Sequence, residues 1–153
     1  MLKWEKTIII PTNIENVWNL FDLENIKRIM PQIVDMKVIN KTENVVGSTY
    51  EQTYKEGKRI MKYIVTDLEY TNTSNYKHTR SGFQLGKMFD IEADYILEKI
   101  NENETKFTYS GQNKGLNFIG KIMLILMPKK QNDKVIVQFI DRVYKESMEE
   151  EHK

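Results

Sequence analysis

The sequence has no cysteine among its 153 residues and only two histidines. Disulfide bonds and thiolate metal sites are therefore excluded. His78 and His152 lie too far apart for the short spacing of a histidine metal motif, and His152 belongs to the charged tail EEEHK. We therefore predict no metal site and no bound cofactor.

Neither charge nor hydrophobicity is concentrated in a long block. The formal net charge of +1 argues against a nucleic-acid partner, because such proteins carry a strong basic excess. The run FIGKIMLILM has ten residues and contains Lys121, whereas a membrane-spanning helix needs about 20 apolar residues. The start, MLKWEKTIIIP, holds too short an apolar run for a signal peptide. We expect a cytoplasmic location and one domain over residues 1–153.

Helix signals follow a first predicted strand at residues 3–10. Thr12 and Glu15 form a T-x-x-E capping box, which predicts a helix N-terminus. The next apolar residues keep the helical spacing i, i+3, i+4 and i+7: Ile14, Val17, Trp18 and Phe21. Asp22 is expected to cap a second short helix that ends near Pro31, because the residue before proline avoids helical conformation.

From residue 32 to residue 112, apolar and polar residues alternate with the period of a strand. In residues 87–100 the apolar side chains share one face, while Asp90, Glu92 and Asp94 share the other and are expected to be solvated. The pattern predicts an antiparallel sheet with one packed face and one wet face. Its strands are expected around residues 34–38, 47–54, 59–70, 75–82, 87–100 and 105–112.

The helical period returns over residues 115–148, which we interpret as a long helix kinked or broken near Pro128. Its expected apolar face comprises Val135, Ile136, Phe139, Ile140 and Val143. The segment begins with GLNFIGK, which fits the phosphate-loop pattern G-x-x-x-x-G-K. Ile122 stands where that loop needs serine or threonine, so we predict no nucleotide site. Gly115 and Gly120 are instead expected to let the helix start and pass close to the sheet.

The apolar run after Gly115 is too apolar all round for an ordinary surface helix. From Lys106 to Asn132 there are five lysines and no acidic residue. One interpretation is contact of this segment with an anionic membrane surface. The other is that acidic residues approach the lysines in the folded chain.

Several phrases together resemble the START-like ligand-binding superfamily, especially its polyketide cyclase/dehydratase-like branch. IPTNIENVWNLFDLENIKRIMP resembles its opening, VVGSTYEQTYKEGK its next strand and hairpin, and NETKFTY its late turn and strand. The resemblance covers nearly the whole chain. It implies an α+β helix-grip fold, in which a curved, seven-stranded antiparallel sheet wraps a long C-terminal helix, with two short helices after the first strand. A cavity is expected between sheet and helix, with FIGKIMLILM in its wall.

We predict that this cavity binds a small apolar or amphipathic molecule, because tyrosine offers apolar walls with polar tips and methionine adds adaptable volume. Tyr76 and His78 alternate with Arg80 on a strand face that is either a polar patch in the cavity or, more typically, a solvated sheet face. The alternative functions are a cyclase or dehydratase, with His78, Arg80 and the tyrosines as candidate acid–base groups, and a protein-interaction domain. The candidate lining residues are Met36, Tyr50, Tyr54, Met61, Tyr63, Tyr76, His78, Phe89, Tyr95, Phe107, Tyr109, Ile119, Ile122, Met123, Leu126 and Phe139.

Overall fold

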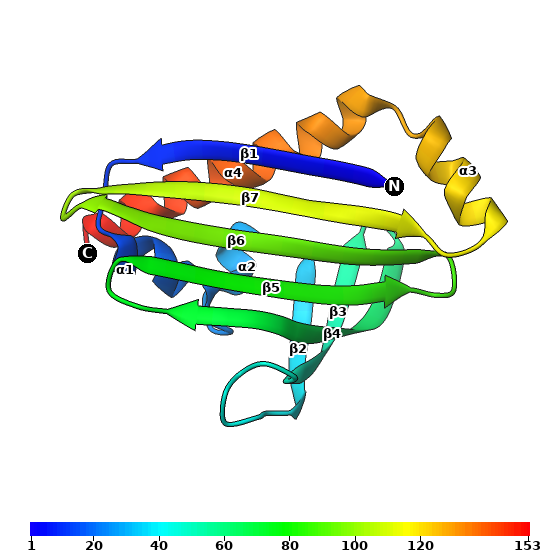
Figure 1. Cartoon of the computed structure of the whole chain (residues 1–153), viewed down its shortest axis with the longest axis horizontal. Coiled ribbons are helices and arrows are strands. Elements are labelled where there is room, and N and C mark those ends of the chain that lie inside the picture. Colours follow the sequence, from blue (N-terminus) through cyan, green and yellow to red (C-terminus); the bar gives the residue numbers. More distant parts are fainter.

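A computed structural model describes residues 1–153 and contains one seven-stranded antiparallel sheet (Figure 1). The strand order β1-β7-β6-β5-β4-β3-β2 places the first strand of the chain beside the last. This arrangement confirms the sheet predicted from the alternation of apolar and polar residues. The strands are β1 (Leu2–Ile10), β2 (Ile33–Asn40), β3 (Thr49–Glu56), β4 (Arg59–Asn72), β5 (Tyr76–Leu85), β6 (Phe89–Asn101) and β7 (Glu104–Gly115).

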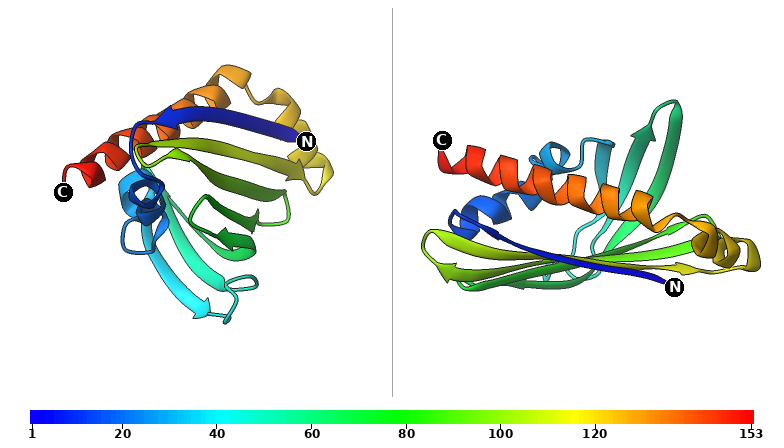
Figure 2. Two further views of the ribbon diagram at one scale, coloured as in Figure 1. Left: turned by 60° about the vertical axis from the view of Figure 1, so that its left-hand side comes forward. Right: turned by 90° about the horizontal axis from the view of Figure 1, so that it is seen from above.

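The sheet is strongly curved. Figure 2 shows that β3 and β4 rise on the side of the sheet that carries the C-terminal helix. In β4 the pairing with β5 shifts between Asp67 and Glu69, so Leu68 and Glu69 both lie on the side away from that helix. The edge strand β2 has two further shifts against β3, one between Ile33 and Asp35 and one near Asn40.

The short helices after β1 are present, but their caps differ from the prediction. Asn13, not Thr12, caps α1 (Ile14–Trp18), and its side chain accepts a 2.9 Å hydrogen bond from the Glu15 amide. Thr12 is fully buried and accepts a hydrogen bond from the side chain of Asn16 instead. Asp22 does not cap a helix N-terminus; it ends the 3-10 turn η1 (Asn19–Phe21). The next helix, α2 (Ile26–Ile29), follows Asn25 and ends just before Pro31, as expected.

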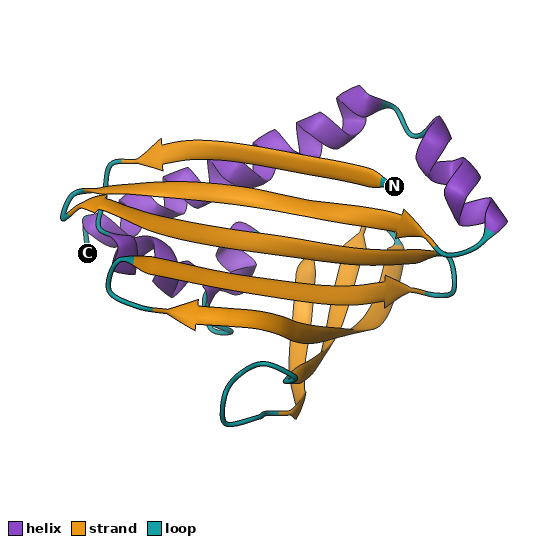
Figure 3. Ribbon diagram, in the orientation of Figure 1, coloured by secondary structure: helices purple, strands orange, loops and turns teal.

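Two helices follow β7, which confirms the break that was predicted near Pro128. Helix α3 (Phe118–Leu126) is separated by a short loop from α4 (Lys129–Glu151), as Figure 3 shows. Met127 and Pro128 both adopt extended backbone conformations at this break. The Asn117 side chain caps α3 by accepting a hydrogen bond from the Gly120 amide.

The core lies between the sheet and the C-terminal half of α4. The predicted helix face is confirmed for Ile136, Phe139, Ile140 and Val143, which are buried, but Val135 is 59% exposed because it lies one position outside this stripe. The strands contribute Ile10, Leu97 and Phe107, and the short helices Ile14, Val17, Leu20, Ile26 and Ile29.

Two charged contacts fix the helices around this core. Lys77 of β5 is buried, and its ammonium group lies 2.9 Å from a carboxylate oxygen of Glu15 and over the Trp18 ring, which ties α1 to the sheet. Arg28 of α2 forms ion pairs with Glu146, at 2.9 Å, and with Glu150 of α4. The C-terminal half of α4 is therefore anchored, whereas its first turns carry no such pair.

Candidate functional site

The face of the sheet toward α4, here called the inner face, carries a row of small residues across its middle. The strand pairing aligns Asp67, Ser81, Ala93 and Gly111 on β4, β5, β6 and β7. Trp4 of β1 ends the row. A Cβ atom at Gly111 would lie only 2.3 Å from the Trp4 ring, so the indole lies directly on the glycine. Ala93 is the only alanine of the chain, and it lies between two other small residues, Ser81 and Gly111.

Aromatic rings stand on both sides of this row. On one side Tyr95 and Tyr109 stack with centroids 5.3 Å apart, and Phe139 of α4 lies 4.7 Å from Tyr109. On the other side Tyr63 of β4 stacks on Phe83 of β5 at 4.4 Å. Small residues between two groups of rings leave the middle of this face with less side-chain volume than its two sides.

The tyrosines of these groups combine deep placement with residual accessible surface. Burial raises the pKa of Tyr109 to about 12 and raises the pKa of Tyr95 well above its usual range. Both side chains nevertheless keep part of their surface accessible, unlike Phe107, which is fully buried. These two tyrosines are therefore deeply placed but not completely covered by neighbouring side chains.

Polar groups also point from the inner face. The buried Gln52 side chain donates a 2.6 Å hydrogen bond to the Tyr63 hydroxyl. Burial raises the pKa of the Asp67 carboxyl, and a hydrogen bond from the Tyr50 hydroxyl partly opposes this change. Near the other end of the row, Trp4 Nε1 and Asn113 Oδ1 are buried without hydrogen-bond partners. The row is therefore flanked by aromatic rings along its sides and by polar groups near both of its ends.

The structure distributes the predicted lining residues over three places. The inner face and α4 hold Met36, Tyr50, Tyr54, Met61, Tyr63, Phe89, Tyr95, Phe107, Tyr109 and Phe139. Tyr76 and His78 lie on the opposite face, because the inward positions of β5 are Lys77, Thr79, Ser81 and Phe83. The residues Ile119, Ile122, Met123 and Leu126 of α3 are exposed at one end of the sheet.

Asp67 and the row of small residues were missed by the sequence-based prediction. A signal for Asp67 exists, since strict alternation in RIMKYIVTDLEY places it on the same face as Met61, Tyr63 and Val65. A carboxylate on an apolar strand face is unusual enough to mark a candidate site. The row itself has no signal along the chain, because it forms only when four strands pair in one register.

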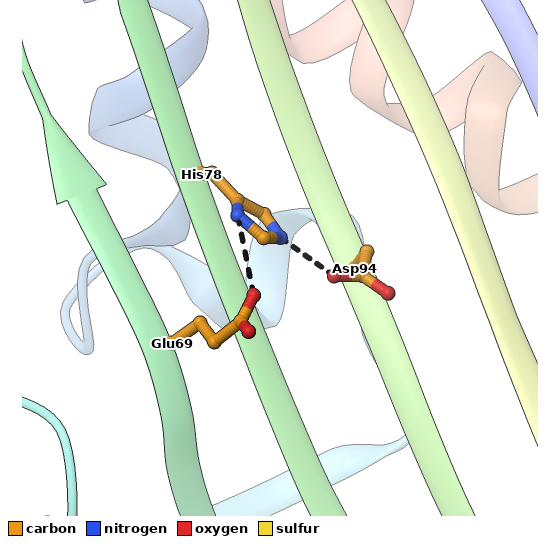
Figure 4. A group of neighbouring side chains, drawn as sticks. All are labelled: Glu69, His78 and Asp94. Carbon is orange, nitrogen blue, oxygen red and sulfur yellow. Dashed lines mark hydrogen bonds and ion pairs between the residues drawn. The ribbon is translucent and has the colours of Figure 1, made fainter.

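On the outer face, His78 lies between two carboxylates, as Figure 4 shows. Its Nε2 atom is 2.6 Å from Asp94 Oδ1, and its Nδ1 atom is 3.7 Å from Glu69 Oε2. Arg80 Nε is 2.9 Å from the same Asp94 oxygen, and the Arg80 guanidinium also contacts Glu69. The positively charged Arg80 side chain thus lies between the two carboxylates. Together with His78 these residues form an ion-pair network that joins β4, β5 and β6. Asp94 is buried by these partners, which corrects the expectation that it is solvated.

Comparison with solved structures shows the same fold elsewhere. The Zhui aromatase/cyclase from Streptomyces sp. R1128 matches with a TM-score of 0.72 and 10% identity, over 96% of this chain and 93% of that one. Norcoclaurine synthase from Thalictrum flavum matches with a TM-score of 0.67 and 10% identity, over 98% and 96%. A conserved protein from Geobacillus kaustophilus matches with a TM-score of 0.64 and 18% identity, over 97% and 96%.

Sequence comparison gives no such match: no family model and no curated protein matches the chain. At these low identities the structural matches establish the architecture alone. The chain thus has a helix-grip fold, as the sequence resemblance predicted, and shares this fold with the aromatase/cyclase and with norcoclaurine synthase.

Proposed function

We propose that the chain has a hollow over the row of small residues, between the inner face and α4, and that it binds a small apolar or amphipathic molecule there. The observation that carries this proposal is the row Asp67, Ser81, Ala93 and Gly111 between two walls of aromatic rings. Rings provide apolar contact area, and their hydroxyl groups orient a ligand that carries a few polar atoms. A norcoclaurine synthase structure of the same fold contains dopamine and hydroxybenzaldehyde, which are ligands of this kind.

A cavity-filling substitution tests this proposal. Ile91 of β6 lies on the inner face beside the row, and Ile96 lies on the outer face of the same strand. We expect Ile91→Trp to weaken binding of the apolar dye ANS by about tenfold or more, because the indole would occupy the ligand's space. Ile96→Trp, the matched control, should retain wild-type affinity. Dye fluorescence titration measures both.

ANS also binds exposed apolar surface, so a second control uses Ile125→Ser with Leu126→Ser on α3, whose side chains are exposed. Retention of dye binding in this variant would place the dye in the hollow. The proposal would be overturned if the α3 variant lost dye binding while Ile91→Trp still bound the dye with wild-type affinity. Native mass spectrometry of freshly purified protein, with extraction of any co-purifying molecule, would identify the natural ligand class.

Asp67 favours a second candidate function, a cyclase- or dehydratase-type enzyme. A carboxyl whose pKa is raised by burial holds its proton more readily and is suited to general acid catalysis. In such a reaction Asp67 would protonate a hydroxyl group that leaves as water, and the carboxylate so formed would accept the proton from the neighbouring carbon as the double bond forms.

Asp67→Asn separates the two candidates. An enzyme would convert a β-hydroxy thioester to the unsaturated thioester with loss of water, and the variant would lose this conversion while still binding ANS.

The raised pKa of Asp67 means that the folded state favours the neutral carboxyl, so this residue's contribution to stability is lost as the pH rises above 3.8. We therefore expect Asp67→Asn to unfold at a slightly higher temperature than wild type at pH 7, and at an equal one in acid. A lower melting temperature at pH 7 would contradict this expectation.

A further inference from the structure

Helix α3 presents its largest apolar side chains to solvent. Phe118 is 77% exposed, Ile125 81% and Leu126 74%, and only Gly120 and Leu124 of this helix are buried. A soluble domain rarely leaves such a continuous apolar surface uncovered unless it binds a partner or a membrane. The helix lies at the end of the sheet, beyond the break that separates it from α4 (Figures 1 and 3).

Glycine contacts determine which way α3 faces. A Cβ atom at Gly120 would lie 2.3 Å from the Met88 carbonyl oxygen, and one at Gly115 would lie 2.6 Å from the Lys121 amide. The helix therefore packs backbone against backbone at the β5–β6 turn and the end of β7, as predicted for these two glycines. Because glycine makes this contact, the bulky side chains on the opposite side of the helix point away from the protein.

Unpaired lysines surround this apolar surface. Lys114, Lys121, Lys129 and Lys130 are all exposed, and none of them lies within 4.0 Å of an acidic group. The chain contains no acidic residue between Lys106 and Asn132. The alternative considered from the sequence, that acidic residues neutralise the lysines in space, applies only to Lys106, which pairs with Glu98 at 3.7 Å.

We propose that α3 docks the protein onto a membrane surface that contains anionic lipid. Phe118, Ile125 and Leu126 would enter the boundary between headgroups and acyl chains, and the four lysines would meet the headgroups. The charge pattern favours a membrane over a second copy of this chain, because two copies would bring the same lysines together. No helix of the structure is long and apolar enough to cross a bilayer, so the contact is with the surface. The proposal does not depend on ligand binding in the hollow.

Flotation of the protein with lipid vesicles tests this docking. Wild type should float with vesicles of phosphatidylcholine and phosphatidylserine, should not float with phosphatidylcholine alone, and should be released by salt. Lys129→Glu with Lys130→Glu should bind the anionic vesicles about thirtyfold more weakly or worse, since each basic residue near the surface contributes about a factor of five. Ile125→Ser with Leu126→Ser should also lose flotation.

A charge-matched control separates the docking surface from net charge. Lys41→Glu with Lys58→Glu reverses two exposed lysines in the β2–β3 loop and the β3–β4 turn and should float like wild type. Equal melting temperatures would show that all variants remain folded. Absence of wild-type flotation, equal binding to neutral vesicles, or equal loss in the control variant would overturn the proposal. A different outcome would also overturn it: wild type forms a dimer and does not float, and the double variant Ile125→Ser with Leu126→Ser is a monomer. In that case α3 would bind a second copy of the chain.

Discussion

Replacing Phe107 by alanine is expected to lower the free energy of unfolding by about 3–5 kcal/mol. The ring is fully buried near the start of β7, and its centroid lies 6.0 Å from that of Phe21 and 6.4 Å from that of Phe139. It thus joins the sheet to η1 and to α4, and its removal leaves a cavity that none of these elements fills without moving. Urea denaturation measures the change.

Ile125→Ala is the matched control for Phe107→Ala, because it also removes an apolar side chain but from an 81% exposed position. Its free energy of unfolding should stay within about 0.5 kcal/mol of wild type. A loss below about 1 kcal/mol for Phe107→Ala would show that the core does not depend on the contact of β7 with η1 and α4.

Alkaline pH should destabilise the protein steeply, through Tyr95 and Tyr109. The pKa of Tyr109 is raised from 10.0 to about 12 in the folded state, chiefly by burial, and burial also raises the pKa of Tyr95. Below pH 10 both phenols are neutral in the folded and unfolded chains. Above pH 10 only the unfolded chain releases these protons, so stability is lost as the pH rises toward the folded-state values.

For Tyr109 alone, the rise of its pKa from 10.0 to about 12 corresponds to about 2.3 kcal/mol of stability lost by pH 12. Tyr109→Phe keeps the ring and removes the proton, so its free energy of unfolding should fall less between pH 9 and pH 12 than that of wild type. Urea denaturation at several pH values measures this difference. Tyr144→Phe, at an exposed tyrosine of α4, should follow the wild-type curve. Identical pH curves for wild type and Tyr109→Phe would show that the phenol is solvated in the folded protein.

The fold could be predicted because its signals are local. Alternation identifies each strand, and Pro128 fixes the break between α3 and α4. The caps of the short helices were assigned wrongly because Thr12 and Asn13 are both good capping residues, and burial of Thr12 decides between them. Which of the two residues caps the helix depends on tertiary packing, and the local sequence does not contain this information.

The candidate site could be predicted only in part, because it depends on contacts between strands. Alternation gives the residues that share a face within a strand, but Ser81, Ala93 and Gly111 meet only through the register of three strands. The shift at Leu68 also changes the face of every later residue in β4, so Tyr70 points inward where uninterrupted alternation would place Glu69. The orientation of α3 depends on its glycine contacts with β7 and Met88 and is therefore a tertiary property as well.

The interruptions in β2 have a consequence for association between molecules. β2 is the last strand of the sheet, and Val34, Val38 and Ile39 are exposed on it. An uninterrupted apolar edge of this kind would offer its free amide and carbonyl groups to a strand of another molecule. The pairing shifts after Ile33 and before Asn40 bend each end of β2, and exposed Asp35 and Lys37 lie between them. The regular part of β2 is thus short and charged, which disfavours pairing with a strand of another molecule at this edge of the sheet.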